Sequence, residues 1–199
     1  MVRSVIIASL VASAAAFAPA PVSQRTNVAL NAEMSKALPF LVKPEKLDGS
    51  MAGDFGFDPM GLSEIQVDLK YARWAELKHG RICMLAIVGM IIQEAGIHVP
   101  GSQFTEVDPF AAINKVGYVG NMQIFLTIGI IELANFDKYY GEGQPGDIGF
   151  GSLKGKSDAD AEKAQVQEIK HARLAMIGFM GAVAQTVMFH TKLIGGGPL

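Results

Sequence analysis

A duplicated segment limits the folds that this chain can adopt. Residues 76–90 and residues 168–182 align at a constant offset without a gap, and six of the fifteen aligned positions are identical. Both copies contain the pattern Glu-x-Lys-His-x-Arg-x-x-Met. A shorter pattern, Gly-Asp-x-Gly-Phe, precedes each copy, at residues 53–57 and 146–150. Two copies of a loop followed by a helix predict two equivalent helices related by a pseudo-twofold axis.

Three long apolar segments indicate a helical membrane protein. They cover residues 65–97, 116–136 and 161–189, and the first and third contain the two copies of the repeat. Each is long enough to cross a hydrocarbon core, which requires roughly 20 residues in a helix. Half of the 199 residues are hydrophobic and only 18% are charged, which agrees with this location. We therefore expect an all-α membrane protein with three transmembrane helices, of which the first and third form a pseudo-twofold crossed pair.

The charged residues of the repeat predict how these two helices cross. On a helix, Glu76 and Arg81 lie about 140° apart, so they cannot pair with each other. About a twofold axis, Arg81 meets Glu168 and Arg173 meets Glu76, which gives two symmetric ion pairs. An unpaired charge at the bilayer centre costs roughly 3 kcal/mol, so pairing lowers this cost and fixes the register of the crossing. Small residues are expected near the crossing, where the backbones approach each other: Ala86, Gly89, Gly178 and Gly181.

The first 31 residues have the composition of targeting segments. Residues 1–16 combine a basic start, an apolar core and a run of small residues, which is typical of a signal peptide. Residues 17–31 contain no acidic residue, which is typical of a transit segment. Residues 14–19 resemble the Ala-Phe-Ala-Pro junction of plastid-targeting presequences in algae whose plastid lies inside the secretory system. We expect residues 32–199 to form the membrane domain, and an ordinary secreted protein is the alternative for the leader.

The charge and cysteine content exclude two further features. A formal net charge of -2 and the lack of any Lys/Arg cluster give no case for nucleic-acid binding. Cys83 is the only cysteine, so an intrachain disulfide is impossible.

The paired motifs and their loops resemble the light-harvesting chlorophyll-binding family. Together with the presequence they are most similar to its fucoxanthin-chlorophyll a/c branch, and the resemblance extends over about residues 53–189. It implies an antenna protein, not an enzyme, that binds chlorophyll a, chlorophyll c and fucoxanthin or related carotenoids and transfers excitation energy to photosystems. The implied location is the plastid thylakoid membrane, as a multi-pass protein. The implied partners are thylakoid lipids, photosystem I or II and other antenna subunits, with no nucleic acid.

The resemblance also implies which residues hold the pigments. The Mg²⁺ ion of chlorophyll has a free axial position that a carboxylate, an amide oxygen or a neutral imidazole can fill. The implied Mg²⁺ ligands are Glu76, His79, Glu168, His171 and Gln185. Each glutamate also accepts a hydrogen bond from the arginine of the other helix: Glu76 from Arg173 and Glu168 from Arg81. The implied ligands in the middle helix are Gln123 and Glu132. The loops resemble those that hold carotenoid head groups, through Asp54, Phe57, Asp147 and Phe150.

The chain departs from the green-plant members of the family in three places. His171 stands where those members usually have Asn, and His is typical of the chlorophyll a/c branch. Gln123 and Glu132 are nine residues apart, where green-plant members have eight, which leaves open whether both face a pigment. Nine residues follow His190, and the C-terminal amphipathic helix with its histidine ligand is not evident. That site is therefore not carried over to this chain.

Three other interpretations stay open. The glutamates and histidines of the repeat could serve as ion-pair and core residues alone, and the glutamines could form hydrogen bonds between helices. Paired Glu-x-x-His motifs also occur in di-iron carboxylate bundles, but these need two more carboxylates from other helices, and only Glu132 is available. A stress-type family member that dissipates excitation is the third, with acidic residues such as Asp158 and Asp160 as candidate sensors.

Overall fold

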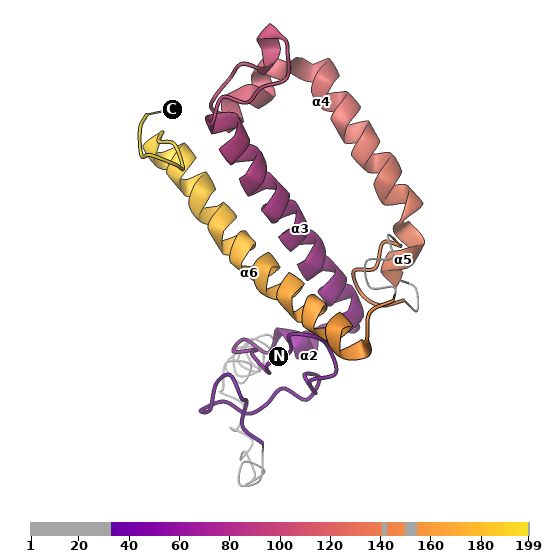
Figure 1. Ribbon diagram of the computed structural model, residues 1–199. Coiled ribbons are helices and arrows are strands. Elements are labelled where there is room, and N and C mark those ends of the chain that lie inside the picture. The colour runs from indigo at the N-terminus through magenta and orange to yellow at the C-terminus, as the bar shows by residue number, and fades with distance from the viewer. Residues whose placement is uncertain (1–32, 141–142, 150–154, 199) are drawn as a thin grey trace, which may run out of the picture.

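The computed structural model describes residues 33–140, 143–149 and 155–198 (Figure 1). The expected signal peptide, residues 1–16, and transit segment, residues 17–31, lie outside these residues. The described chain is helical, and its extended pairings are two isolated β-bridges. Its elements are α2 (Leu62–Ile65), α3 (Leu69–Glu94), η2 (Ser102–Phe104), α4 (Pro109–Ala134), α5 (Phe136–Tyr140) and α6 (Asp158–Phe189).

Each of the three long helices begins directly after a side chain that caps its first turn. The side chain at each of these positions accepts a hydrogen bond from a backbone N–H group of that turn, which would otherwise lack a partner. The caps are Asp68, Asp108 and Ser157. The proline at the first position of α4 fits there because its missing N–H group is not needed in the first turn. The caps therefore set where the helices start, three to seven residues away from the starts of the apolar segments.

Two of the described helices, α4 and α6, are long and apolar enough to cross a membrane. The remaining long helix, α3, has the same 26-residue length as α4. Its apolar part is flanked by charged residues, with Arg81 on one side and Glu94 on the other. The charges of α3 therefore need partners if this helix is to lie in a bilayer.

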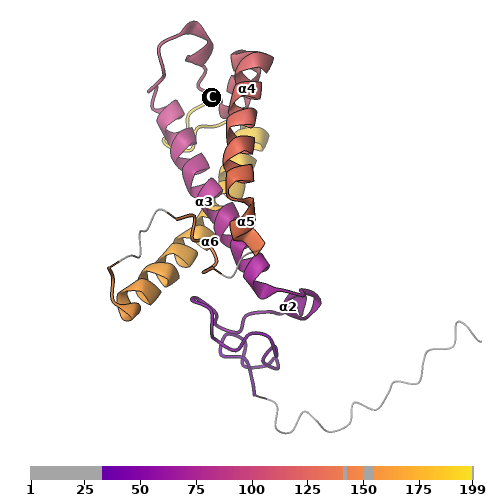
Figure 2. The same ribbon diagram turned by 90° about the vertical axis from the view of Figure 1, so that its right-hand side faces the viewer.

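Helices α3 and α6 pack directly against each other and cross (Figures 1 and 2). Their closest approach is at Gly80 and Ala172, where a Cβ atom added to Gly80 would lie 2.8 Å from the Cα atom of Ala172. Ala172 is completely buried, at 0% exposure. The two residues occupy equivalent positions in the repeat, so the pseudo-twofold axis of the pair passes through their contact.

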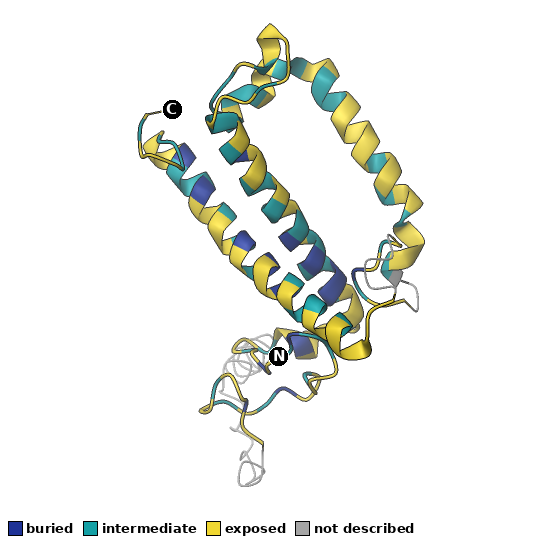
Figure 3. Ribbon diagram, viewed as in Figure 1, coloured by how far each residue is buried: buried dark blue, intermediate teal, exposed yellow. Residues whose placement is uncertain are grey.

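The core of the molecule follows this crossing. Figure 3 shows that the buried residues gather along the seam between α3 and α6. The buried hydrophobic residues are Trp74, Leu77, Met90, Ile169, Ala172, Ala175 and Ala182. A seam this narrow leaves the outer faces of both helices exposed and apolar, as expected for helices surrounded by lipid or pigments.

The expected positions of small residues at the crossing were wrong in part. A Cβ atom added to Gly89 or Gly181 would meet no atom within 4 Å, so these glycines do not lie at the contact. At Gly178 the added atom would lie 3.5 Å from Ile87, which is ordinary packing. The helices cross closer to the charged residues of the repeat, where the pair Gly80 and Ala172 allows the nearest approach, and they diverge towards the other glycines.

Helix α4 stands apart from the crossed pair and is held at its ends. None of its residues is buried, and it packs mainly against η2 and α5 (Figure 1). Gly117 breaks the helix, with φ 78° and ψ 172°. The side chain of Asn121, four residues after the break, donates a hydrogen bond to the carbonyl of Ile113, four residues before it, at 2.7 Å and so bridges the break. Such compensation is needed wherever a helix is broken within a membrane.

Candidate functional site

Two interhelix ion pairs form the centre of the site. The Nε atom of Arg81 donates to Glu168 Oε1 at 2.7 Å, and the Nε atom of Arg173 donates to Glu76 Oε1 at 2.6 Å. All four side chains are partly buried and lie beside the helix crossing. Both ion pairs expected from the repeat are therefore present in the structure.

The second carboxylate oxygens of the two glutamates differ in their surroundings. Among the described residues, no donor reaches Oε2 of Glu168. At Glu76, the Nη1 atom of Arg73 lies 3.5 Å from Oε2. Arg73 is buried, at 8% exposure, and donates to the carbonyl of Ala52 at 2.8 Å. In the repeat, the position of Arg73 corresponds to Gln165, so the second copy has no such guanidinium.

The two histidines of the repeat have identical local geometry. The Nδ1 atom of His79 lies 2.7 Å from the carbonyl of Ala75, and the Nδ1 atom of His171 lies 2.7 Å from the carbonyl of Gln167. A carbonyl only accepts hydrogen bonds, so Nδ1 must carry the proton in each neutral ring. Both side chains are exposed on the outer surface of their helices. Each histidine therefore presents an unprotonated Nε2 atom, the form of imidazole that ligates a metal.

The two Gly-Asp-x-Gly loops form the same turn. The side chain of Asp54 accepts a hydrogen bond from the N–H group of Gly56 at 2.9 Å, and that of Asp147 accepts one from Gly149 at 2.8 Å. Both of these glycines have positive φ, 70° and 89°, which a residue with a Cβ atom adopts only with strain. The aspartates expected at the carotenoid head groups thus shape the loops themselves. Phe57 is exposed, whereas Phe150 lies outside the described residues.

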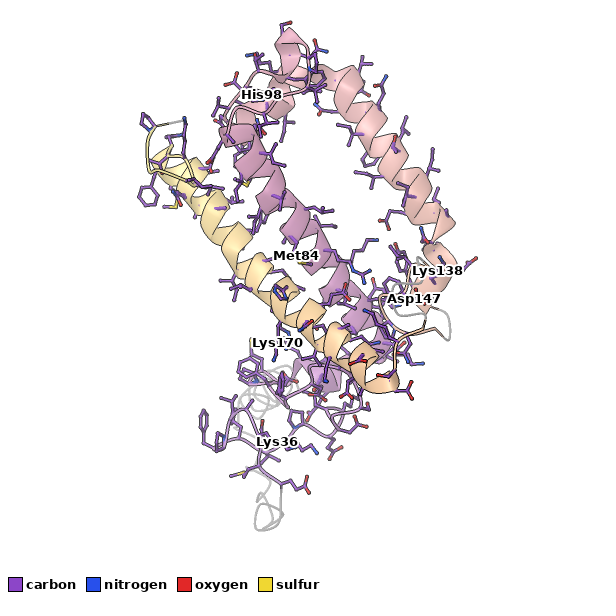
Figure 4. All side chains as sticks on the ribbon, in the orientation of Figure 1. Lys36, Met84, His98, Lys138, Asp147 and Lys170 are labelled. Atoms are coloured by element: carbon purple, nitrogen blue, oxygen red, sulfur yellow. The ribbon has the colours of Figure 1, made fainter. Side chains whose placement is uncertain are left out.

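Each loop is tied to the arginine of the opposite helix. Arg173 Nη1 donates to the carbonyl of Gly53, in the loop before α3, at 3.2 Å. On the other side, Gly146 in the loop before α6 packs against Arg81 and Leu77. Figure 4 shows Asp147 of this loop beside Lys138 of α5, which donates to the carbonyl of Ile148 at 2.7 Å. The arginines therefore join the helix crossing to both loops.

A hollow lies between the first loop and the crossed helices. It has a volume of about 700 Å³, and its lining includes Phe57, Leu62, Leu69, Arg173 and Ile177. The lining combines apolar side chains with the guanidinium and carboxylate groups of one ion pair. It can accept a long apolar molecule that has a polar end.

The carboxylate of Asp58, beside this loop, holds the short helix α2 in place. Its oxygens accept hydrogen bonds from the backbone N–H groups of Leu62 at 3.0 Å and Ser63 at 2.7 Å. Desolvation raises the pKa of Asp58, but the hydrogen bonds donated by Ser63 and Leu62 outweigh it and hold the pKa below its ordinary value. The stabilisation from this ionised cap is present above the ordinary pKa of a carboxyl and is lost as the pH falls through the lowered one.

A third charged cluster, which sequence reasoning missed, connects α3 to α4. Lys78 forms an ion pair with Glu132 and donates to the hydroxyl of Tyr139 at 2.7 Å, while that hydroxyl also contacts Glu132. A pocket of about 340 Å³ lies beside the cluster and includes Trp74 and His79 in its lining. The signal in the sequence was the lysine that recurs in both copies of the motif.

The two expected glutamine ligands have different environments. Gln185 is partly buried, and its Nε2 atom donates to the carbonyl of Lys192 at 2.8 Å. In the described part of the chain no donor reaches its amide oxygen, so this oxygen can bind a metal. Gln123 is exposed on α4. Nine residues of unbroken helix separate it from Glu132, which places the two about 180° apart. The nine-residue spacing therefore puts these two side chains on opposite faces of α4.

The arrangement suits a metal ion that is already coordinated by a cofactor and needs only one ligand from the protein. Among the described residues, no three His, Cys, Asp or Glu side chains gather as a metal-binding group. Single carboxylate, imidazole and amide donors on the surfaces of apolar helices instead fit the one axial position of a tetrapyrrole metal.

Comparisons with known proteins identify the family of this chain. A family model described as Chlorophyll A-B binding protein matches residues 43–187. Fucoxanthin-chlorophyll a-c binding protein F of Phaeodactylum tricornutum is 36% identical, over 94% of this chain and 94% of its own length. Protein C of the same series and organism is 34% identical, over 89% of this chain and 92% of its own. Chlorophyll a-b binding protein CP24 10A of Solanum lycopersicum is 34% identical, over 70% of this chain and 68% of its own.

Proposed function

Because the chain belongs to the chlorophyll A-B binding protein family, we propose that it is a light-harvesting antenna protein that binds chlorophyll a, chlorophyll c and fucoxanthin or a related carotenoid. It acts in the thylakoid membrane of a plastid as a multi-pass protein and passes excitation energy to photosystem I or II, directly or through other antenna subunits. The mature domain begins near residue 32, after the signal peptide (1–16) and the transit segment (17–31).

The observation that carries this proposal is the duplicated set of ligand atoms. One carboxylate oxygen of Glu168 accepts a hydrogen bond from Arg81, and the other has no donor among the described residues, so Glu168 can bind Mg²⁺ in an electrically balanced site. Glu76 is held in the same way by Arg173 and has Arg73 as a second, longer contact. The Nε2 atoms of the two histidines in the repeat would hold the metal of two further chlorophylls.

The pigments supply the absorption and transfer of excitation, and the protein fixes where they lie. The Glu–Arg pairs hold two ligands rigidly at the helix crossing, where the backbones are in contact. The histidine ligands are oriented by hydrogen bonds to the preceding turn of the same helix.

The remaining pigment positions lie away from the helix crossing. Gln185 and the two polar residues of the middle helix, Gln123 and Glu132, supply these outer ligands. The loops of Asp54 and Asp147 and the hollow beside Phe57 receive carotenoid ends, with Phe150 as the matching aromatic residue of the second loop.

Three membrane spans agree with the charges of α3. Arg81 of this helix is paired with a carboxylate of α6, and Lys78 is paired with Glu132 of α4. Paired charges insert into a bilayer at a lower cost than isolated ones, so α3 can accompany α4 and α6 through the membrane. Three spans place the N-terminal loop and the C-terminal turn on opposite sides, in agreement with their positions at opposite ends of the crossed pair (Figure 1).

Fluorescence excitation of the purified, detergent-solubilised complex tests this function. An antenna protein gives chlorophyll emission when light is absorbed by the carotenoid, with a lifetime in the range of unquenched chlorophyll. Short-lived, quenched emission at neutral pH would instead indicate a family member that dissipates excitation. If excitation at wavelengths absorbed by the carotenoid produces no chlorophyll emission, energy transfer within the complex is contradicted.

A further inference from the structure

The last residue of α3 holds the C-terminal turn of the chain. Both carboxylate oxygens of Glu94 lie 2.9 Å from the backbone N–H nitrogen of Leu193, and Oε2 lies 3.3 Å from that of Ile194. Leu193 and Ile194 lie in the turn that follows α6. Hydrogen bonds to an ionised carboxylate are stronger than those between neutral groups. Glu94 therefore anchors this turn to the end of α3.

The same turn orients the side chain of Gln185. His190 ends α6 in the left-handed conformation, with φ 50°, and the chain then folds back. The fold is closed by a hydrogen bond from Lys192 N–H to the carbonyl of Gly197 at 2.8 Å. The carbonyl of Lys192 accepts a hydrogen bond from the Nε2 atom of Gln185 at 2.8 Å. Glu94 and Gln185 thus hold adjacent residues of one short turn.

The orientation of an amide decides whether it can bind a metal. The amide oxygen of Gln185 has free electron pairs, whereas its NH₂ group offers only hydrogen atoms. A carbonyl beside the NH₂ group favours the orientation in which the oxygen points away from the turn. If the turn moves, the amide can rotate and present its NH₂ group in place of the oxygen.

We propose that Glu94 is a positioning residue for the chlorophyll ligated by Gln185. It fixes the turn at Leu193, the turn fixes the carbonyl of Lys192, and that carbonyl sets the amide of Gln185 with its oxygen towards Mg²⁺. This inference rests on the proposed function, because it assigns Gln185 to a chlorophyll. It adds a residue of α3 to a pigment site that is otherwise formed at the end of α6.

The test compares four variants of the full chain purified with pigments: Glu94→Ala, Glu94→Gln, Gln185→Leu and Glu106→Ala. Glu106 is the matched control, because it lies at the same end of the molecule and pairs with Lys115 at 3.0 Å instead of holding the turn. Pigment stoichiometry and low-temperature absorption difference spectra identify the chlorophyll affected. Amide hydrogen exchange of residues 190–196 reports the order of the turn.

Gln185→Leu is expected to lose one chlorophyll band, and Glu94→Ala to weaken or shift that same band. In Glu94→Ala the turn is expected to exchange roughly tenfold faster, as the loss of hydrogen bonds to a charged group implies. Glu94→Gln keeps one acceptor and restores part of the band, whereas Glu106→Ala leaves it unchanged. The double variant of Glu94 and Gln185 loses no more than Gln185→Leu alone.

Three results would overturn the inference, and they distinguish its failure from the failure of the proposed function. If Gln185→Leu loses its band while Glu94→Ala keeps it, Glu94 does not position Gln185, and the antenna function stands. If Glu94→Ala weakens every pigment band equally, or behaves like Glu106→Ala, its role is structural. If Gln185→Leu keeps all its pigment, the ligand assignment of Gln185 fails together with this inference. If the Glu94→Ala protein does not accumulate, Glu94→Gln takes its place in the test. The inference then requires that Glu94→Gln partly shifts the band that Gln185→Leu loses.

Discussion

At the scale of single residues, the two glutamates of the repeat occupy unequal electrostatic sites. Glu76 lies near two guanidinium groups, those of Arg173 and Arg73, whereas Glu168 has only Arg81 among the described residues. Asp54 also interacts electrostatically with Arg73, so the site at Glu76 combines two guanidinium groups with two carboxylates, whereas the site at Glu168 has one of each. A pigment on Glu76 would therefore lie in a different electrostatic environment from one on Glu168, and the two sites are expected to differ in pigment energy although their sequences match.

The loss of one arginine is expected to have unequal effects at the two sites. Arg81→Leu leaves Glu168 without a cation, whereas Arg173→Leu leaves Glu76 with Arg73 at 3.5 Å. An unpaired charge at the bilayer centre costs roughly 3 kcal/mol. We expect both variants to lose heat stability and pigment yield, and Arg81→Leu to lose more. Thermal loss of the visible circular dichroism signal measures this, and a larger loss in Arg173→Leu would contradict the asymmetry.

Removal of one histidine is expected to remove pigment without unfolding the chain. His79 is exposed, and among the described residues it forms a hydrogen bond only within its own helix, so the helix crossing does not depend on it. His79→Leu should lose about one chlorophyll per chain, because leucine has no atom that can ligate Mg²⁺. His98→Leu, beyond the end of α3, is the matched control and should keep full pigment. Unchanged pigment stoichiometry in His79→Leu would remove this residue from the ligands.

The contacts between the two copies of the repeat could be predicted from the sequence, and the contacts with segments that have no copy could not. The interhelix ion pairs follow from the constant offset and the angle between Glu76 and Arg81 on a helix. The partner of Lys78 lies on α4, which has no copy in the chain, so no symmetry argument places it. Lys170, the equivalent lysine, forms no ion pair among the described residues, because α4 lies beside only one of the two copies. The hydrogen bond of Arg73 to Ala52 likewise depends on the path of a loop.

At the scale of elements, the crossing of α3 and α6 is set by one pair of small residues. Gly80 and Ala172 lie on the pseudo-twofold axis, directly between the two Glu–Arg pairs, and any larger side chain there would push the helices apart. A wider separation would lengthen both ion pairs at once. The sequence contained several candidate small residues. The expectation was wrong for Gly89 and Gly181, because the position of closest approach along two helices depends on the packing of all their side chains.

A methyl group at the crossing is expected to be destabilising. In Gly80→Ala the added atom would overlap Ala172, and overpacking of this kind typically costs about 1–3 kcal/mol. Gly89→Ala, in the same helix, is the matched control, because its added atom meets nothing within 4 Å and alanine favours helix by about 1 kcal/mol. We expect the thermal denaturation midpoint to fall in Gly80→Ala and to rise in Gly89→Ala. Equal stability of both would place the crossing elsewhere.

At the scale of the whole molecule, two helices form a packed unit and the third is held at a distance. Helices α3 and α6 share a buried seam, whereas α4 has no buried residue and is joined to the pair through Lys78, Glu132 and Tyr139 at one end and through η2 at the other. Bound pigments can cover the face of α4 that the protein leaves open. The stability of α4 is therefore expected to depend on pigment more than that of the crossed pair does.

Pigment removal is expected to loosen α4 first. In the complex with its pigments extracted, backbone amides of α4 should exchange faster with solvent, while those around Ala172 stay protected by the seam. Hydrogen exchange of the loaded and the extracted protein in the same detergent measures the difference. Equal loss of protection in all three helices would show that the crossed pair also depends on pigment for its packing.

The central claim is that the paired helices form a scaffold for chlorophyll, and extraction of pigment from the purified protein tests it most directly. The account predicts chlorophyll a, chlorophyll c and a keto-carotenoid in fixed molar ratios to the chain. A colourless protein, or one that carries only iron, would contradict it, because the glutamates and histidines of the repeat would then serve another purpose.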